Sequence, residues 1–112
     1  MTGKYKVVVY QTATGREPFY EWLSSLDKSV EGRVQARIER LEWGNFGNAK
    51  ALKSGLFEIK FRSPPFRIYY ALVDKQIVLL VFGGDKSQQS DDIKKSKVYL
   101  RDYRSRYGIE KK

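Results

Sequence analysis

The residues best suited to chemistry in this 112-residue sequence are basic side chains gathered around one short turn. In KFRSPPFRIYY, residues 60–70, we expect two strands joined by the loop SPPF, with Arg62 facing Arg67 across the hairpin. Alternation along the strands puts Lys60 on the same face, opposite Tyr69. Like charges placed opposite each other weaken a sheet, and an anion bound between them would offset the repulsion. Because the arginine fork matches two phosphate oxygens, this pattern predicts a phosphate site.

Two aromatic residues accompany these charges. Phe66 and Tyr69 would offer ring surfaces on which unpaired bases could stack. Basic groups interleaved with aromatic ones are typical of proteins that recognise single-stranded RNA. The alternative is an ordinary solvent-facing side of a sheet, with its charges neutralised by Glu58 or by a helix at the end of the chain.

A second stretch, VFGGDKSQQSDDI, follows an apolar run that is typical of a buried strand. Its paired glycines allow the backbone to turn sharply. Asp85 and Lys86 would then project from the end of the sheet, near the base of the charged hairpin. An ordinary turn would use the same residues, so this stretch by itself is weak support for a site.

Composition narrows the class of protein. The chain is long enough for a single domain, residues 1–112, with one modest core. It has no cysteine and no histidine, which argues against disulfides, structural zinc, histidine acid–base pairs and any metal or other cofactor. The sequence lacks a signal peptide and a run of about 20 apolar residues, so we expect a cytoplasmic protein without membrane contact.

The net charge of +9 and the pI of about 9.8 indicate a nucleic-acid partner. Eight basic residues against two acidic ones fall in residues 94–112, and Lys94 and Lys95 are candidate RNA contacts there. A solvated amphipathic helix would show the same composition. A further stripe of arginines includes Arg37, which either contacts RNA or extends from the rim of a buried helix.

The hydrophobic periodicity predicts the elements that would position these residues. A strand is expected over residues 4–10, then a short helix capped by Thr14 and Glu17. A second helix runs from about Val30 to Gly44, and residues 44–55 form a loop. Three strands and a last helix, capped by Ser87 or Ser90, complete the order β-α-α-β-β-β-α. This is an α+β fold: two N-terminal helices pack on a small, mostly antiparallel sheet, and a C-terminal helix follows.

With this order in hand, the chain resembles the RelE/ParE superfamily of toxins from type II toxin–antitoxin modules. It is most similar to the branch called addiction-module killer proteins, often grouped with HigB-like toxins. The resemblance covers nearly the whole chain, and its motifs are PFYEWLSSL (18–26), RIERLEWGNFGNAKAL (37–52), LFEIKFR (56–62) and FRIYYALVDKQIVLLVFGGDKSQQSDDIKKS (66–96).

The resemblance implies a partner and a target. Its RelE side consists of ribosome-dependent endoribonucleases that cut mRNA, each neutralised by an antitoxin that often carries a helix-turn-helix domain. Its ParE side inhibits DNA gyrase. The family's catalytic basic residues correspond to Lys60, Arg67 and Lys86, and Arg62 matches a further basic position. Where the family has a lysine and a tyrosine, this chain has Glu58 and Asp92.

For an endoribonuclease of this kind we expect a reaction without metal, in which a 2′-OH attacks the adjacent phosphate. Lys60 is the candidate base, because neighbouring positive charges lower the pKa of an amine. Arg62 and Arg67 would stabilise the phosphorane. Glu58 is an alternative base, and Lys86 is the acid or a further phosphate clamp. The alternatives are a gyrase inhibitor and a nucleic-acid-binding module without catalysis.

Overall fold

The order of helices and strands follows the prediction, with one short strand added. The computed structural model describes residues 4–62 and 65–108. Its main elements are β1 (Lys6–Val9), α1 (Pro18–Leu23), α2 (Lys28–Glu42), β2 (Lys50–Ala51), β3 (Leu56–Lys60), β4 (Phe66–Asp74), β5 (Ile77–Asp85) and α3 (Gln89–Tyr107). The two-residue strand β2 lies within the segment expected to be a loop, because it pairs with the edge of β3.

The strands form one sheet in the order β1-β5-β4-β3-β2. Only the β1–β5 pair is parallel, and the other three pairs are antiparallel, which confirms the prediction of a mostly antiparallel sheet. The apolar run in β5 lies between β1 and β4, and residues 78–81 are buried. The prediction of a strand covered on both faces is therefore confirmed for β5.

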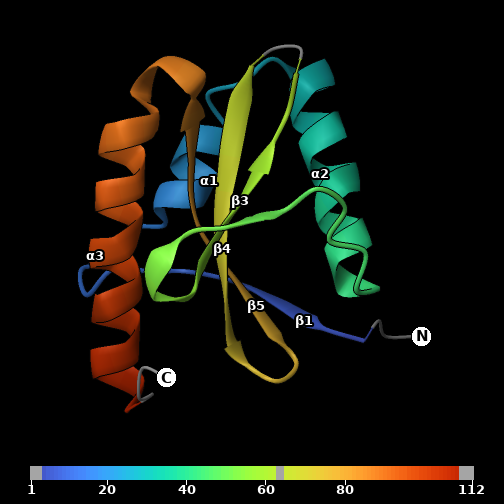
Figure 1. The fold of residues 1–112 in the computed structure, drawn as a ribbon. Helices are drawn as coiled ribbons and strands as arrows, with labels where there is room; N and C mark the ends of the chain where they lie inside the picture. The colour runs from blue at the N-terminus through green and yellow to red at the C-terminus, as the bar shows by residue number, and fades with distance from the viewer. Residues whose placement is uncertain (1–3, 63–64, 109–112) are drawn as a thin grey trace.

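Helices α1 and α2 cover one face of the sheet, as predicted, because their buried side chains share one core. Figure 1 shows α2 across the sheet from α3. The apolar stripe of α2, with Val34, Ile38 and Leu41 one helical turn apart, is buried against this face. Every second residue of β3 and β4 points to the same side, which places Ile59 and Ile68 in this core.

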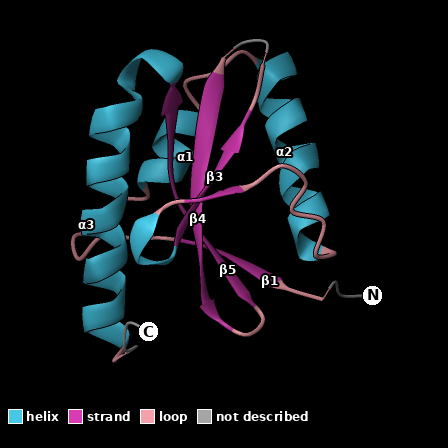
Figure 2. Ribbon diagram, viewed as in Figure 1, coloured by secondary structure: helices cyan, strands magenta, loops and turns pink. Residues whose placement is uncertain are grey.

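Helix α3 covers the opposite face, across the sheet from α2 (Figure 2). This core contains Leu56, Tyr69 and Leu79 from the strands and Leu100 from the helix. The sequence left open whether this face would be exposed or covered, and the structure shows that α3 covers it. The face that carries the basic hairpin residues is consequently exposed only near the hairpin tip.

Two helix starts differ from the prediction. Glu17 precedes the first residue of α1, Pro18, and no side chain of the described residues caps this helix, so the Thr14 capping box is wrong. A 3-10 turn over Lys86–Gln88 leads into α3 and takes the place of a serine cap. Within residues 4–62 and 65–108, no helix is long and apolar enough to cross a bilayer.

Candidate active site

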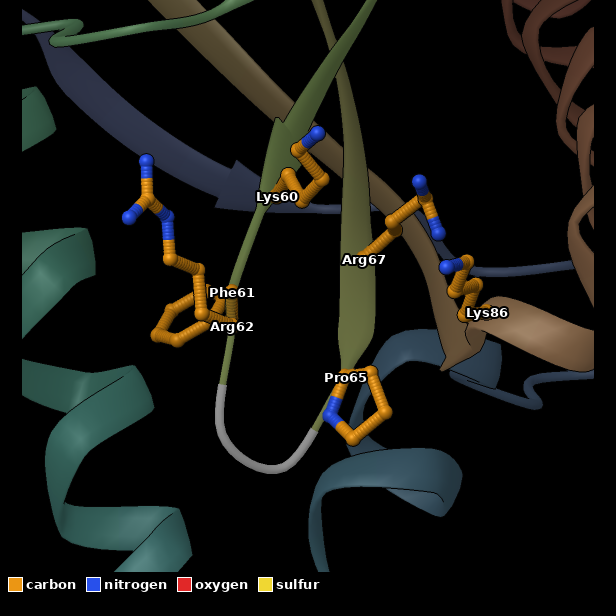
Figure 3. A pocket seen from close by; sticks show the side chains of 6 residues that line it. All are labelled: Lys60, Phe61, Arg62, Pro65, Arg67 and Lys86. Carbon is orange, nitrogen blue, oxygen red and sulfur yellow. The ribbon is translucent and has the colours of Figure 1, made fainter.

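A pocket of about 200 Å³ opens at the tip of the β3–β4 hairpin. Its six lining residues are Lys60, Phe61, Arg62, Pro65, Arg67 and Lys86 (Figure 3). We call it the cationic pocket, since four of the six are basic. The structure thus brings together all four basic residues expected at the site. They come from the end of β3, the start of β4 and the turn after β5, so sheet pairing is what assembles them.

Within this pocket, Arg67 and Lys86 are the two basic residues whose side chains are arranged most like a clamp. Their side chains extend toward each other from neighbouring strand ends, while Arg62 extends to the other side of the hairpin (Figure 3). The backbone N–H of Lys86 donates to the carbonyl of Pro65 at 3.0 Å, which ties the end of β5 to the hairpin. Two cations held in this way suit an anion that bridges them, such as a phosphate.

The hairpin register differs from the one predicted. Lys60 is directly opposite Arg67, and Glu58 is opposite Tyr69, so Arg62 and Arg67 are not partners. The reason lies on the opposite face, where the rings of Phe61 and Phe66 stack with centroids 4.5 Å apart. The observed pairing differs from the predicted one by two residues. Because side chains alternate with a period of two, each one still lies on the face predicted for it. The expected crowding of basic groups therefore persists, but between Lys60 and Arg67.

Arg67 is held by a buried ion pair. Its side chain is 9% exposed, and its Nε lies 3.2 Å from Oε2 of Glu58, whose side chain is 5% exposed. The geometry is that of a charge pair, since this Nε makes no hydrogen bond with the described residues. Glu58 in turn accepts a hydrogen bond of 2.6 Å from Nε2 of Gln89 at the start of α3. The contact of Gln89 with Glu58 holds the carboxylate in place, and the carboxylate in turn orients the guanidinium of Arg67.

Glu58 as an alternative base stays a prediction. Its contacts with Arg67 and Gln89 engage Oε2, and the residue is 4% exposed. The observed contacts are structural ones, in which Glu58 links Gln89 to Arg67. Gln89 was missed by the sequence reasoning, because its contact with Glu58 joins positions 31 residues apart and leaves no local pattern.

The two predicted stacking residues are buried, and this part of the prediction is wrong. Phe66 is 3% exposed and packs edge-on against Trp22 with ring centroids 5.3 Å apart. Tyr69 is fully buried beneath α3. Burial, followed by the nearby Glu58 carboxylate, raises the pKa of Tyr69 well above its ordinary value, so its hydroxyl stays protonated. Phe61, which the sequence reasoning did not select, is the ring that lines the pocket.

Arg37 uses its guanidinium to fix the segment after α2. It donates hydrogen bonds to the carbonyl of Asn45 at 3.0 Å and to that of Phe46 at 2.6 Å. Burial, with a smaller contribution from Arg40, lowers the pKa of Arg37. Of the two interpretations left open, the structural one has these observed contacts; contact with RNA stays a prediction.

Lys94 and Lys95 are both exposed on α3, as an RNA contact requires. The ammonium of Lys95 lies 5.8 Å from the centroid of the Phe82 ring, a cation–π distance that holds it near the end of β5. Neither residue lines the cationic pocket. Their role in binding therefore stays a prediction.

The fold is that of RelE. A double mutant of the Escherichia coli toxin RelE, solved in its free state, superposes with a TM-score of 0.54 and covers 78% of this chain and 97% of its own. The sequence identity between the two is 17%. This similarity in fold confirms the predicted α+β class.

The family is shown by the sequence. The chain belongs to the family described as phage-derived protein Gp49-like, which matches residues 21–104. An uncharacterised protein of Haemophilus influenzae is 39% identical over 82 residues, which are 71% of this chain and 83% of that protein. The expected membership of the RelE superfamily of toxins is thereby confirmed.

Proposed function

We propose that this protein is the toxin of a toxin–antitoxin pair and that it cleaves mRNA on the ribosome. The observation that carries the proposal is the cationic pocket, in which Arg67 is held by Glu58 beside Lys60 and Lys86. A binding surface for phosphate needs only positive charge, and exposed lysines would be sufficient. A buried, pre-oriented arginine indicates stabilisation of charge that develops during a reaction.

In the proposed reaction, the 2′-oxygen of one nucleotide attacks the adjacent phosphorus and the bond to the 5′-oxygen breaks. Lys60, opposite Arg67 in the hairpin, accepts the proton of the 2′-OH as a neutral amine. Lys86 supplies a proton to the leaving 5′-oxygen. The products are a 2′,3′-cyclic phosphate and a 5′-hydroxyl end, and the proton lost by the nucleophile is balanced by the one gained by the leaving group.

Arg67 is the main donor to the phosphorane oxygens in this scheme. Its fork is fixed from behind by Glu58, so no reorganisation is required when negative charge accumulates. Arg62, on the other side of the hairpin, is suited to an adjacent phosphate of the same strand. Removal of one such fixed donor typically lowers kcat by about 10²–10³-fold.

The partners follow from the same surface. A cognate antitoxin, with a helix-turn-helix DNA-binding domain in our proposal, would cover the cationic pocket with acidic or apolar groups. The ribosome and mRNA would contact Lys94, Lys95 and the other basic residues of α3. A ribosomal substrate places the activity in the cytoplasm.

The test is cleavage of mRNA in purified programmed ribosomes, run beside a gyrase supercoiling assay. The variants are Lys60→Met, Lys60→Arg and Lys75→Met. Lys75 is a matched control, because it is an exposed lysine in the β4–β5 turn at the other end of the sheet. We expect cleavage by the unaltered protein and by Lys75→Met, and a loss of at least about 10²-fold in Lys60→Met.

Each alternative gives a different result. Inhibition of supercoiling without mRNA cleavage would show a gyrase inhibitor and overturn the proposal. Full activity of Lys60→Arg would contradict proton transfer by Lys60, because arginine keeps the charge but does not deprotonate. A module that binds nucleic acid without catalysis would instead show no cleavage by the unaltered protein and unchanged RNA binding by Lys60→Arg.

A further inference from the structure

A second and larger cavity, of about 550 Å³, adjoins the cationic pocket. It lies where α1 and α3 approach the end of β5, and its lining includes Trp22, Phe66, Gly83, Gly84, Asp85 and Asp92. Residues that line the two cavities are adjacent in the sequence at two places. Asp85 precedes Lys86, and Phe66 lies between Pro65 and Arg67, which line the cationic pocket.

The glycine pair shapes this cavity from both faces of the sheet. A Cβ at Gly83 would lie 2.2 Å from the Trp22 ring, and a Cβ at Gly84 would lie 1.9 Å from Oδ2 of Asp92. Neither approach would be possible with a larger residue. The missing side chains therefore let an aromatic ring and a carboxyl group reach the same end of β5.

Asp92 is the unusual member of the lining. It is 6% exposed, and its Oδ2 has no hydrogen-bond partner among the described residues. Burial raises the pKa of this carboxyl, and the nearby Asp85 and Asp91 carboxylates act in the same direction while Lys95 opposes them. A buried acceptor without a donor destabilises the fold. The presence of Asp92 at this position therefore has no explanation in terms of stability.

We propose that this cavity binds a guanine base of the RNA whose phosphate occupies the cationic pocket. The Watson–Crick edge of guanine carries two adjacent N–H donors, which match the two oxygens of the Asp92 carboxylate. Adenine and cytosine present one donor beside an acceptor on that edge. The ring of Trp22, which is partly exposed in this cavity, supplies the aromatic wall that an extruded base requires, and Phe66 supports that ring from behind.

The position of the cavity favours a nucleotide over an isolated cation. A guanidinium group would also suit a carboxylate beside an aromatic ring, but it would make no use of Arg67 and Lys86 next door. A guanine nucleotide has a donor edge for Asp92 and a phosphate for those two cations. This inference rests on the proposed function, since it names the base at the same site.

The test uses the fluorescence of Trp22. In the intact protein, Trp43→Phe leaves Trp22 as the only tryptophan, and Trp43 is not part of either cavity. GMP, IMP and AMP are then titrated without ribosomes. IMP lacks the 2-amino group of guanine but keeps the remaining donor. We expect GMP to quench Trp22 and to bind about tenfold more tightly than IMP or AMP.

Asp92→Asn supplies the decisive comparison, with Asp85→Asn as the matched control at the exposed rim. Asp92→Asn should abolish the preference for GMP, whereas Asp85→Asn should retain it. Circular dichroism establishes that both variants are folded. Equal quenching by all three nucleotides, or equal effects of the two substitutions, would overturn the inference.

Agmatine, a small guanidinium compound, serves as the competing probe. If agmatine binds in an Asp92-dependent manner and GMP does not, the cavity is a cation site and the inference is wrong. These titrations involve no cleavage, so their outcome is independent of the ribosome assay. A protein that binds GMP through Asp92 without cutting mRNA would contradict only the proposed function.

Discussion

The two faces of the sheet are built on different principles. The face under α1 and α2 is closed by aliphatic and aromatic side chains. The face under α3 contains all the buried polar residues found in the described part of the chain: Glu58, Arg67, Asp92 and Ser96. Several of their atoms have no hydrogen-bond partner there.

We propose that the polar residues of the α3 face lower stability and serve the function of the protein. Apolar packing satisfies a fold by itself, whereas a buried charge must be compensated or it destabilises the protein. Arg67 and Asp92 line the two candidate cavities and Glu58 contacts Arg67, so we propose that these three residues belong to a site; Ser96 lines neither cavity. Variants of each polar residue test that explanation.

The largest effect is expected from Arg67→Ala. The change should lower cleavage by about 10²–10³-fold through loss of a fixed donor. It also leaves Glu58 buried without its cation, which should lower the free energy of unfolding by about 3–5 kcal/mol. Thermal and urea denaturation measure the second quantity. Arg62→Ala is the control: this residue is exposed in the same pocket, so its loss should leave stability nearly unchanged.

Glu58→Gln should have a smaller effect and sharpen the role of Glu58. If the carboxylate positions Arg67, kcat should fall by about tenfold while the shape of the pH–rate profile stays the same. Gln89→Ala should weaken cleavage in the same way, because it removes the donor to Glu58. A lost limb of the pH profile in Glu58→Gln would instead identify Glu58 as the base.

Asp92→Asn should change stability with pH. The folded-state pKa of Asp92 is raised by burial, so its contribution favours folding at acid pH and is lost as the pH rises through that folded pKa. The variant removes this loss and should melt at a higher temperature than the unaltered protein at pH 7, with the gain disappearing in acid. A constant difference across the pH range would contradict burial of an ionised carboxylate.

Ser96→Ala should have the smallest effect, and its sign is the informative part. Ser96 is fully buried, and its Oγ lacks a partner among the described residues. Its replacement should stabilise the protein by up to about 1 kcal/mol, measured by urea denaturation. Ser105→Ala, exposed on the same helix, corrects for the helix propensity of alanine. A loss of stability beyond that control would show that the α3 face does use this hydroxyl.

The sequence alone determined the features that depend on local order. The alternation in LFEIK and FRIYY put Lys60 and Arg67 on one face and Ile59 and Ile68 on the other, because side chains alternate along any strand. The 3.6-residue spacing of Val34, Ile38 and Leu41 likewise predicted the buried side of α2. The basic residues of the site followed from their types and this alternation.

Only the tertiary structure decided which of these residues meet and how deeply they are buried. The stack of Phe61 on Phe66 set the hairpin register, and α3 covered Tyr69, whose neighbours in the sequence suggested exposure. The contacts of Glu58 with Arg67 and Gln89, and of Asp92 with Gly84, join distant positions through the packing of α3 on the sheet. Long-range contacts of this kind have no period along the chain, and for that reason sequence patterns did not reveal them.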